Sequence, residues 1–546
     1  IVTMQPGAEP ADQAAQDDAH LRSLGIKPEL RRTLGFLSVF AVAFSYISVS
    51  TGTFTNQAVG YGVGGPVTVF WAWFLVVIGQ SFVALNFAEL SSHFPVAGSI
   101  YQWSKRLSNR TLGWFTGWIY FWAGVVTVTA VAVTVPLVLS TIMNIKLGDP
   151  SVVPGLDNQQ FLGLVTLVIS TIINVAGVRI LAVLNNIGVV AEIVGMLVFA
   201  LILLFFANHQ SPSILFDTST TSGLAGGNFL AVFLVGMLMP LFVVYGFDTA
   251  GTFGEETVDA SRRAPRGVLA AIWLSGIVGA VFLLAVTLSF KDLGAAVTSA
   301  QNFGFPIADT LTQNLTFVLF NGFTFGQLYL VVILIAVFVC TLAIQGATVR
   351  LLFSMGRDGR VPLSGVWAHV NPTLKTPANA GLAVGILAAI PVLITGAGGA
   401  AILAISATGL IYLAYFMCNL GVFFARRRGW PHQTAPFSLR SYGTIINVIA
   451  LIWGGVMIIN IGLWTAPDIF GIYGNDLRNT WTNPFINTFL NFFGNPLTDL
   501  PAIPVFEATL AVIVVFGVIY YLVALRGKVD VVQVAADTAT GETAIA

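Results

Sequence analysis

Apolar positions along the chain fall into twelve long runs separated by short polar connections. The runs predict helices near residues 34 to 60, 65 to 90, 112 to 143, 159 to 177, 180 to 206, 228 to 258, 265 to 289, 326 to 355, 378 to 396, 400 to 425, 441 to 464 and 505 to 525. A helix needs roughly 20 residues to cross a bilayer. Because backbone groups in lipid must be hydrogen-bonded within their own segment, these runs predict spanning helices. The longer predicted connections are 211–227, 290–313 and 467–504.

The composition agrees with a membrane protein. Of the 546 residues, 56% are hydrophobic and 9% are charged, whereas soluble domains carry roughly 25% charged residues. The formal net charge is zero, so nothing indicates a nucleic-acid partner. The sequence contains no zinc-protease motif, phosphate-binding glycine loop or nucleophile elbow. We therefore expect no enzyme, no cofactor and no metal site.

Basic residues are distributed unevenly among the predicted connections. When the N-terminus is placed in the cytoplasm, only Lys146, Lys291 and Arg478 of the 24 Lys and Arg residues fall outside. Short cytoplasmic loops of membrane proteins carry an excess of these residues. We therefore predict a multi-pass protein of the plasma or inner membrane with both termini in the cytoplasm.

The first apolar run is interrupted where a spanning helix is usually most apolar. Its sequence "AFSYISVSTGTF" places Ser48, Ser50, Thr51 and Gly52 together. Glycine and hydroxyl residues weaken helical hydrogen bonding, so the helix is expected to unwind here if its backbone lines a cavity. Close helix packing through small residues is the alternative interpretation.

The sixth run is interrupted in the same way. Its sequence "MPLFVVYGFDTAGTFGEET" contains Pro240, Gly246 and the acidic Asp248. Free amide groups at such a break can bind a carboxylate, and free carbonyl groups can bind a cation. The aromatic rings of Phe242 and Tyr245 can enclose an aliphatic group or face an amine. Aromatic packing within the bundle is the alternative.

The two breaks are five runs apart, which is typical of an inverted repeat with binding at the membrane midplane. We therefore divide the chain into a cytoplasmic segment, two five-helix repeats, a helix pair and a cytoplasmic tail that we expect to be disordered. Their predicted limits are 1–33, 34–206, 228–425, 441–525 and 526–546.

Glu192 lies near the middle of the fifth run, where acidic side chains are scarce. An ionised carboxylate is costly to bury in a membrane. Glu192 is therefore a candidate proton-coupling group that gains and loses a proton as access alternates between the two sides. A permanently protonated acid, hydrogen-bonded inside the bundle, is the other interpretation, and the sequence leaves both open.

Charged residues gather where the sixth and eighth runs end on the predicted cytoplasmic side. Asp248, Glu255, Arg262 and Arg357 are candidates for a gate whose ion pairs break when the protein opens inward. Solvated loop charges also pair weakly and without function, which is the alternative.

Four separated stretches resemble the amino acid/polyamine/organocation superfamily, especially its amino acid and choline permeases. They are "LRSLGIKPELRR", "GGPVTVFWAW" with "AELSSHFPVAGSIYQW", "YGFDTAGTFGEETVDASRRAPRG" and "RLLFSMGRDGRVP". The resemblance covers most of the chain. It implies an all-α membrane protein with a LeuT-like five-plus-five inverted repeat and two additional C-terminal helices.

The resemblance also implies roles for particular residues. Phe242 matches an occluding aromatic gate, and Phe242, Val243 and Tyr245 match substrate-facing positions. The family's Gly-small-Gly break is here Ser50, Thr51 and Gly52, so the first glycine is replaced. Glu192 matches a position where some proton-coupled relatives carry a lysine. An acid there can relay a proton, attract a cationic substrate or support sodium, and these options stay open.

We therefore expect a secondary transporter that imports small amines or amino acids, such as gamma-aminobutyrate, choline or polyamines. The driving force is expected to be the proton gradient, with sodium as the less favoured ion. An exchanger is the main alternative, and a channel or a transporter-like nutrient sensor fits less well. The expected partners are the substrate and the lipid bilayer, with the protein a monomer or weak dimer.

Overall fold

The structure is a computed structural model of the chain. It describes residues 10–219, 229–301, 304–395, 399–465 and 505–526. The predicted connection 467–504 and the predicted tail beyond residue 526 lie outside the described residues.

The first half of the chain is helical with short connections. Its elements are α1 Pro10–Ser23, α2 Phe36–Ile47, α3 Val49–Thr55, the π-helix η1 Ala58–Gly64, α4 Gly65–His93, α5 Ser99–Leu107, α6 Arg110–Ala132, α7 Thr134–Met143, α8 Asn158–Ala176, α9 Val178–Phe206 and the 3₁₀ helix η2 Pro212–Phe216.

The second half adds one small antiparallel hairpin to the helices. Its elements are α10 Phe229–Gly236, α11 Leu238–Val243, α12 Thr249–Thr252, η4 Gly254–Glu256, α13 Ala260–Leu288, α14 Leu293–Gln301, α15 Pro306–Asn314, β1 Val318–Phe320, β2 Phe323–Thr324, α16 Phe325–Arg357, α17 Ser364–Trp367, α18 Ala378–Thr395, α19 Gly399–Arg427, η5 Arg440–Tyr442, α20 Gly443–Thr465, α24 Val505–Tyr520 and η6 Tyr521–Leu525.

Each of the twelve predicted runs is helical in the structure. Ten described helices are long and apolar enough to cross a membrane, and two shorter apolar helices, Val232–Val243 and Ala378–Leu393, account for the sixth and ninth runs. The segment 290–313, predicted as a connection, contains the two short helices α14 and α15. The third run also divides, into α6 and α7, at Val133.

Local sequence signals explain several helix boundaries. Asp157 and Gln160 form a capping box at the start of α8, and Thr324 and Gln327 form another at the start of α16. Each box satisfies amide groups that lack partners in the first helical turn. Pro66, in the first turn of α4, needs no amide partner there.

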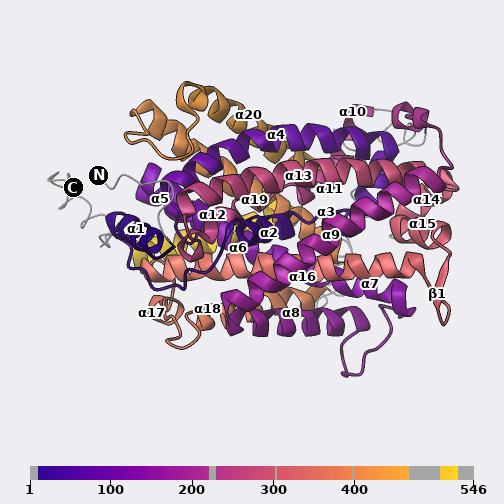
Figure 1. Cartoon of the computed structure of the whole chain (residues 1–546), viewed down its shortest axis with the longest axis horizontal. Coiled ribbons are helices and arrows are strands. Elements are labelled where there is room, and N and C mark those ends of the chain that lie inside the picture. Colours follow the sequence, from indigo (N-terminus) through magenta and orange to yellow (C-terminus); the bar gives the residue numbers. More distant parts are fainter. Residues whose placement is uncertain (1–9, 220–228, 302–303, 396–398, 466–504, 527–546) are drawn as a thin grey trace.

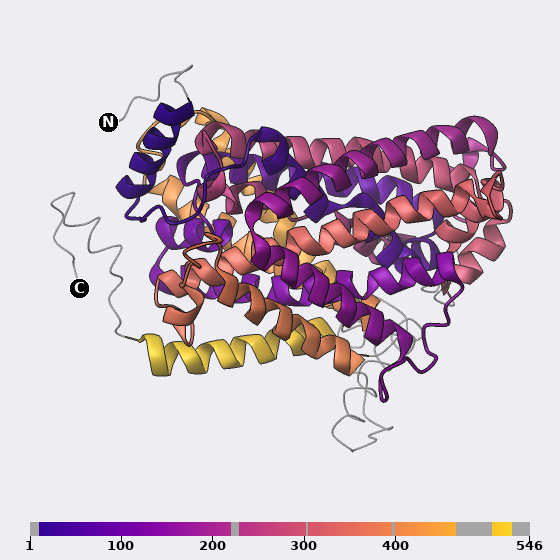
Figure 2. The ribbon, with the colours of Figure 1, turned by 60° about the horizontal axis from the view of Figure 1, so that its bottom comes forward.

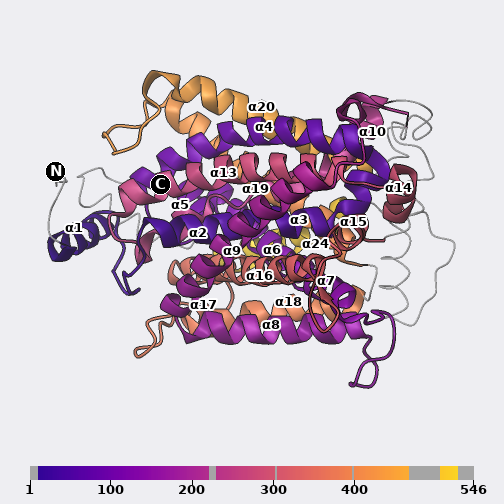
Figure 3. The same ribbon diagram turned by 45° about the vertical axis from the view of Figure 1, so that its right-hand side comes forward.

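The helices form an elongated bundle whose two ends differ (Figure 1). α1, α5 and α17 lie at one end, and α14, α15 and β1 lie at the other. α8 packs beside α18 at one edge, and α4 packs beside α20 at the opposite edge, as Figure 3 shows. α24 runs along the outside of the bundle and ends on the side of α1 (Figure 2).

The interrupted helices lie inside this bundle. Every residue of α3, α11 and α12 is buried. In contrast, only 39% of the most apolar window of α9 is buried, because one face of that helix lies on the outside of the bundle. The irregular backbone is therefore enclosed by protein, as a membrane environment requires.

Candidate functional site

The first break lies at Ser48, between α2 and α3. Ser48 has φ 31° and ψ 93°, a conformation that residues with a side chain rarely adopt. Its hydroxyl accepts a hydrogen bond from the Thr51 amide at 3.4 Å and lies 2.7 Å from the Thr51 hydroxyl. The hydroxyl residues noted in the sequence thus take over hydrogen bonds at the interruption.

Glu192 of α9 contacts this break directly. Its Oε1 accepts hydrogen bonds from the Ser48 hydroxyl at 2.9 Å and from the Ser50 amide at 3.2 Å. The side chain is only 1% exposed. Among the described residues, Glu192 has no Lys, Arg or His within ion-pair distance. The carboxyl group therefore depends on uncharged donors at the point where the first interrupted helix unwinds. We refer to α2 and α3 together as helix 1, and to α10, α11 and α12 together as helix 6.

The second break separates α11, which ends at Val243, from α12, which begins at Thr249. Gly246 lies between them with φ 88°, a left-handed conformation that glycine adopts without a steric penalty. Its amide, released from the helix, donates to the hydroxyl of Tyr415 at 2.9 Å. A tyrosine of α19 therefore satisfies the interrupted backbone.

The two breaks pack against each other through glycine. A Cβ atom on Gly52 would lie 2.4 Å from Cγ2 of Val243, and one on Gly246 would lie 1.9 Å from Cδ1 of Tyr46. Either contact is far shorter than carbon atoms tolerate. These glycines permit the close approach of helices 1 and 6.

Aromatic rings and hydroxyl groups surround the breaks. The ring centroid of Tyr245 lies 6.2 Å from that of Tyr46 and 5.7 Å from that of Phe242. Ser50 Oγ and the Tyr245 hydroxyl are buried and form no hydrogen bond with the described residues, so each can bond to a further polar group. Phe242 is 5% and Tyr245 is 1% exposed, so both rings are shielded from solvent.

Asp248 directly precedes α12, and its carboxyl oxygens accept hydrogen bonds from hydroxyl groups of the described residues. Its Oδ2 accepts from Tyr120 at 2.7 Å and from Ser99 at 2.9 Å, and its Oδ1 accepts from Tyr415. Asp248 therefore does not join the charged residues that follow it in the sequence.

Those charged residues connect three segments at the α1 end of the bundle. Glu255 accepts two hydrogen bonds from Arg357, each 2.9 Å long, and a third from the Ala97 amide at 2.9 Å. Arg350 forms a buried ion pair with Glu256, and Lys105 of α5 forms one with Asp358 at 2.9 Å.

Arg262, a gate candidate in the sequence, lies apart from these pairs. It approaches Asp259, the residue before the start of its helix α13, at 4.0 Å, and its side chain is 25% exposed. The structure thus brings Glu255 and Arg357 together but leaves Arg262 and Asp248 outside their contact.

Sequence reasoning missed Tyr46, Tyr120 and Tyr415. Each is one aromatic residue within an apolar run, and aromatic residues there are usually packing residues. The Arg350–Glu256 and Lys105–Asp358 pairs were also missed. Their partners are 94 and 253 residues apart, and no local signal joins them.

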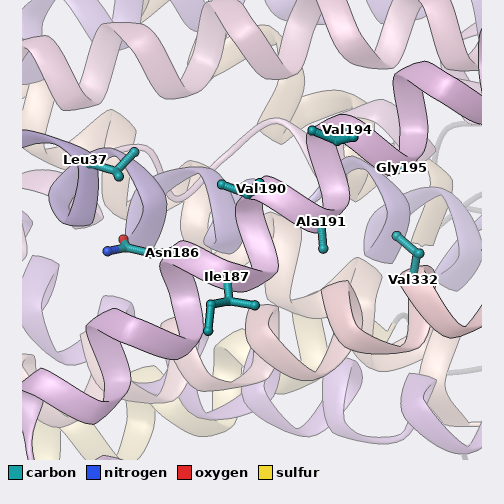
Figure 4. A pocket seen from close by; sticks show the side chains of 8 residues that line it. All are labelled: Leu37, Asn186, Ile187, Val190, Ala191, Val194, Gly195 and Val332. Carbon is teal, nitrogen blue, oxygen red and sulfur yellow. The ribbon is translucent and has the colours of Figure 1, made fainter.

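An apolar groove lies on the exposed side of α9, between α2 and α16 (Figure 4). Ile187, Val190 and Val194 project from α9 along it, and Glu192 lies on the buried side of the same helix. The groove is lined almost entirely by apolar atoms. It therefore lies on a different face of α9 from Glu192, which contacts the first break.

Comparisons with known proteins place the chain among transporters. The family model described as an amino acid permease matches residues 34–494. The amino-acid permease BAT1 of Arabidopsis thaliana is 29% identical over 84% of this chain and 90% of its own length. A putative polyamine transporter of Candida albicans is 26% identical over 85% and 84%, and a choline transporter of Saccharomyces cerevisiae is 24% identical over 87% and 85%.

A solved structure supports the fold class. The crystal structure of MhsT in complex with L-phenylalanine, a protein with the LeuT fold, matches with a TM-score of 0.54 and 13% identity, over 80% of this chain and 99% of that one. The predicted fold class and the predicted family resemblance are both confirmed. The chain therefore belongs to the amino acid permease family of the amino acid/polyamine/organocation superfamily, a family of membrane transporters and not of enzymes.

Proposed function

We propose that the chain imports small amines or amino acids together with protons, driven by the proton gradient. In this proposal Glu192 carries the proton. The observation that supports this most is the bonding of Glu192 to the Ser48 hydroxyl and the Ser50 amide. Proton binding at Glu192 removes its negative charge and so weakens both bonds. Protonation is thereby linked to the conformation of helix 1 at its break.

The substrate binds between the two breaks in this proposal. Ser50 Oγ and the Tyr245 hydroxyl supply hydrogen-bonding groups without internal partners, while Thr51, Gly52, Val243 and Gly246 shape the backbone around them. The carboxyl group of Glu192 already takes the Ser50 amide. A substrate carboxylate therefore has one less amide to bind, which favours an amine as the recognised group.

Alternating access follows from the elements around the site. Phe242, buried beside Tyr245, covers the site as the occluding aromatic residue. The Glu255–Arg357 pair closes the α1 end, which we take as the cytoplasmic end because basic residues gather there. When the protein opens inward, this pair breaks and the substrate is released. Asp248, on helix 6, is a further residue of this gate.

Uptake into liposomes tests the coupling role of Glu192. The probes are radiolabelled gamma-aminobutyrate, choline and putrescine. When the outside solution is more acidic than the liposome interior, the parent protein should accumulate a probe that it transports. Glu192→Gln should abolish accumulation while leaving substrate exchange across the membrane, because exchange needs no net proton movement. Asp217→Asn, which changes an exposed acid that accepts a hydrogen bond from the Ser219 amide at 2.8 Å, is the control.

Three results would overturn parts of this proposal. Accumulation by Glu192→Gln equal to that of the parent would remove the coupling role. Uptake that ignores pH but requires an internal amine would identify an exchanger instead, and uptake that requires sodium would change the ion.

A further inference from the structure

We infer that Asp248 is a second proton-binding site and that it controls the helix 6 break through Tyr415. Only the effect of this proton on alternating access rests on the proposed transport function. Proton binding by Asp248 can be observed without transport. It concerns a group that lies apart from Glu192 and is bonded to different helices.

Hydroxyl donors surround the carboxyl group of Asp248. Its two oxygens accept hydrogen bonds from Tyr415, Tyr120 and Ser99. The three donors come from α19, α6 and α5, and the acid is fully buried. Hydrogen bonds to a charged acceptor are stronger than those to a neutral one. Within the described part of the chain, no basic group forms an ion pair with Asp248.

Tyr415 connects this acid to the backbone of the proposed site. Its hydroxyl donates to Asp248 Oδ1 and accepts the Gly246 amide at 2.9 Å. While Asp248 is ionised, the tyrosine proton points toward the carboxylate and its lone pairs face Gly246. Asp248 is thus a positioning residue that fixes the unwound segment of helix 6 by way of Tyr415.

Protonation changes this arrangement. A neutral Asp248 carries its own O–H donor, and Ser99 can accept this hydrogen bond because its hydroxyl lies 2.7 Å from that of Thr252 and can donate there instead. The bonds from Tyr415 and Tyr120 then end on a neutral acceptor and are weaker than those to the carboxylate. Conversely, movement of helix 6 away from α6 and α19 withdraws the donors and favours proton uptake. Acidification therefore favours the conformation in which helix 6 has left these tyrosines.

Asp248 is the carboxyl group of this cluster. The titratable side chains that face it are Tyr46 of α2, Tyr120 of α6, and Tyr415 and Cys418 of α19. Ordinary tyrosine and cysteine groups lose their protons only above about pH 8. A proton bound here at lower pH therefore belongs to the carboxyl group.

Infrared difference spectroscopy of the purified full chain in lipid, without substrate, tests the site. In a Glu192→Gln background, acidification should produce a carbonyl band of a protonated carboxylic acid that is lost when Asp248→Asn is added. Tyr415→Phe removes one donor from the ionised form, so it should move the midpoint of that band upward by about one pH unit. Tyr61→Phe, which deletes a buried tyrosine bond to Thr287, should not move it.

A band that persists unchanged in the double variant Glu192→Gln with Asp248→Asn overturns the proton site. A midpoint that stays the same in Tyr415→Phe overturns the link through Tyr415. If Asp248→Asn does not fold, Tyr120→Phe provides the same test, because it removes a donor from Oδ2 and should also raise the midpoint. Loss of driven uptake in Glu192→Gln with the band retained separates this inference from the proposed function.

Discussion

At the scale of single residues, the site depends on two glycines as much as on its side chains. Gly52 lets helix 1 reach Val243, and Gly246 lets helix 6 reach Tyr46. Gly52 differs from Gly246 in having a negative φ. The cost of adding a methyl group at Gly52 is therefore steric and does not include backbone strain.

Gly52→Ala should destabilise the purified protein by about 1–3 kcal/mol, the usual cost of overpacking a well-packed core, and should abolish uptake. The added Cβ meets the Val243 side chain at 2.4 Å. Thermal unfolding and liposome uptake measure the two effects. Val243→Ala in the same chain should restore much of the stability. Gly35→Ala, which meets nothing within 4 Å, should match the parent, and an equal loss there would contradict the steric explanation.

At the scale of elements, charged residues join segments that the sequence separates widely. Arg357 ends α16, and Glu255 lies in the short turn after α12. Glu255 also holds the Ala97 amide just before α5. These bonds connect the lower part of helix 6 to α16 and α5, so they must change if helix 6 moves relative to its neighbours.

Arg357→Gln should therefore open the α1 end of the bundle. A buried acid that loses its partner costs several kcal/mol, and opening relieves this by hydrating Glu255. Labelling of a cysteine introduced at Ser99, in a chain with Cys340 and Cys418 replaced, measures water access and should rise.

The exchange of charges in Glu255→Arg with Arg357→Glu should return labelling toward the parent level. Arg262→Gln should have little effect, because exposed pairs contribute about 0–1 kcal/mol. Equal labelling in Arg262→Gln and Arg357→Gln would mean that the Glu255–Arg357 pair does not hold this end closed.

At the scale of the whole molecule, the α1 end is fastened by polar contacts from several parts of the chain. Asp358, just after α16, accepts hydrogen bonds from Tyr101 at 2.8 Å and from Gln102 and Lys105 at 2.9 Å. Burial raises the pKa of the Asp358 carboxyl, but the charges of Lys105 and Arg357 outweigh burial and hold that pKa below its ordinary value.

This lowered pKa gives a pH dependence of defined sign. A carboxyl group whose pKa is lower in the folded state stabilises the protein above its ordinary pKa of about 3.9, and the contribution disappears as pH falls through the folded-state value. Asp358→Asn should thus lower the melting temperature at pH 7 and differ less from the parent as pH falls below about 4. A difference that is constant with pH would show that packing alone is responsible.

The sequence by itself determined the spans, the fold class and the positions where helices break. Lipid leaves the backbone no partner but its own segment, so long apolar runs must form helices. Hydroxyl residues such as Ser48 and glycines such as Gly246 weaken a helix locally, whatever surrounds it, although Ser50 and Gly52 remain helical within α3. Glu192 was conspicuous for the same reason, since an acid in an apolar run is costly unless it has a role.

Only the tertiary structure decided which side chains meet. Glu192 lies 144 residues from Ser48, and Asp248 takes its donors from three separate helices. Such pairs depend on how each helix is rotated and tilted, and packing between helices sets both. Arg262 and Arg357 look alike in the sequence. Because of this packing, only Arg357 of the two reaches Glu255.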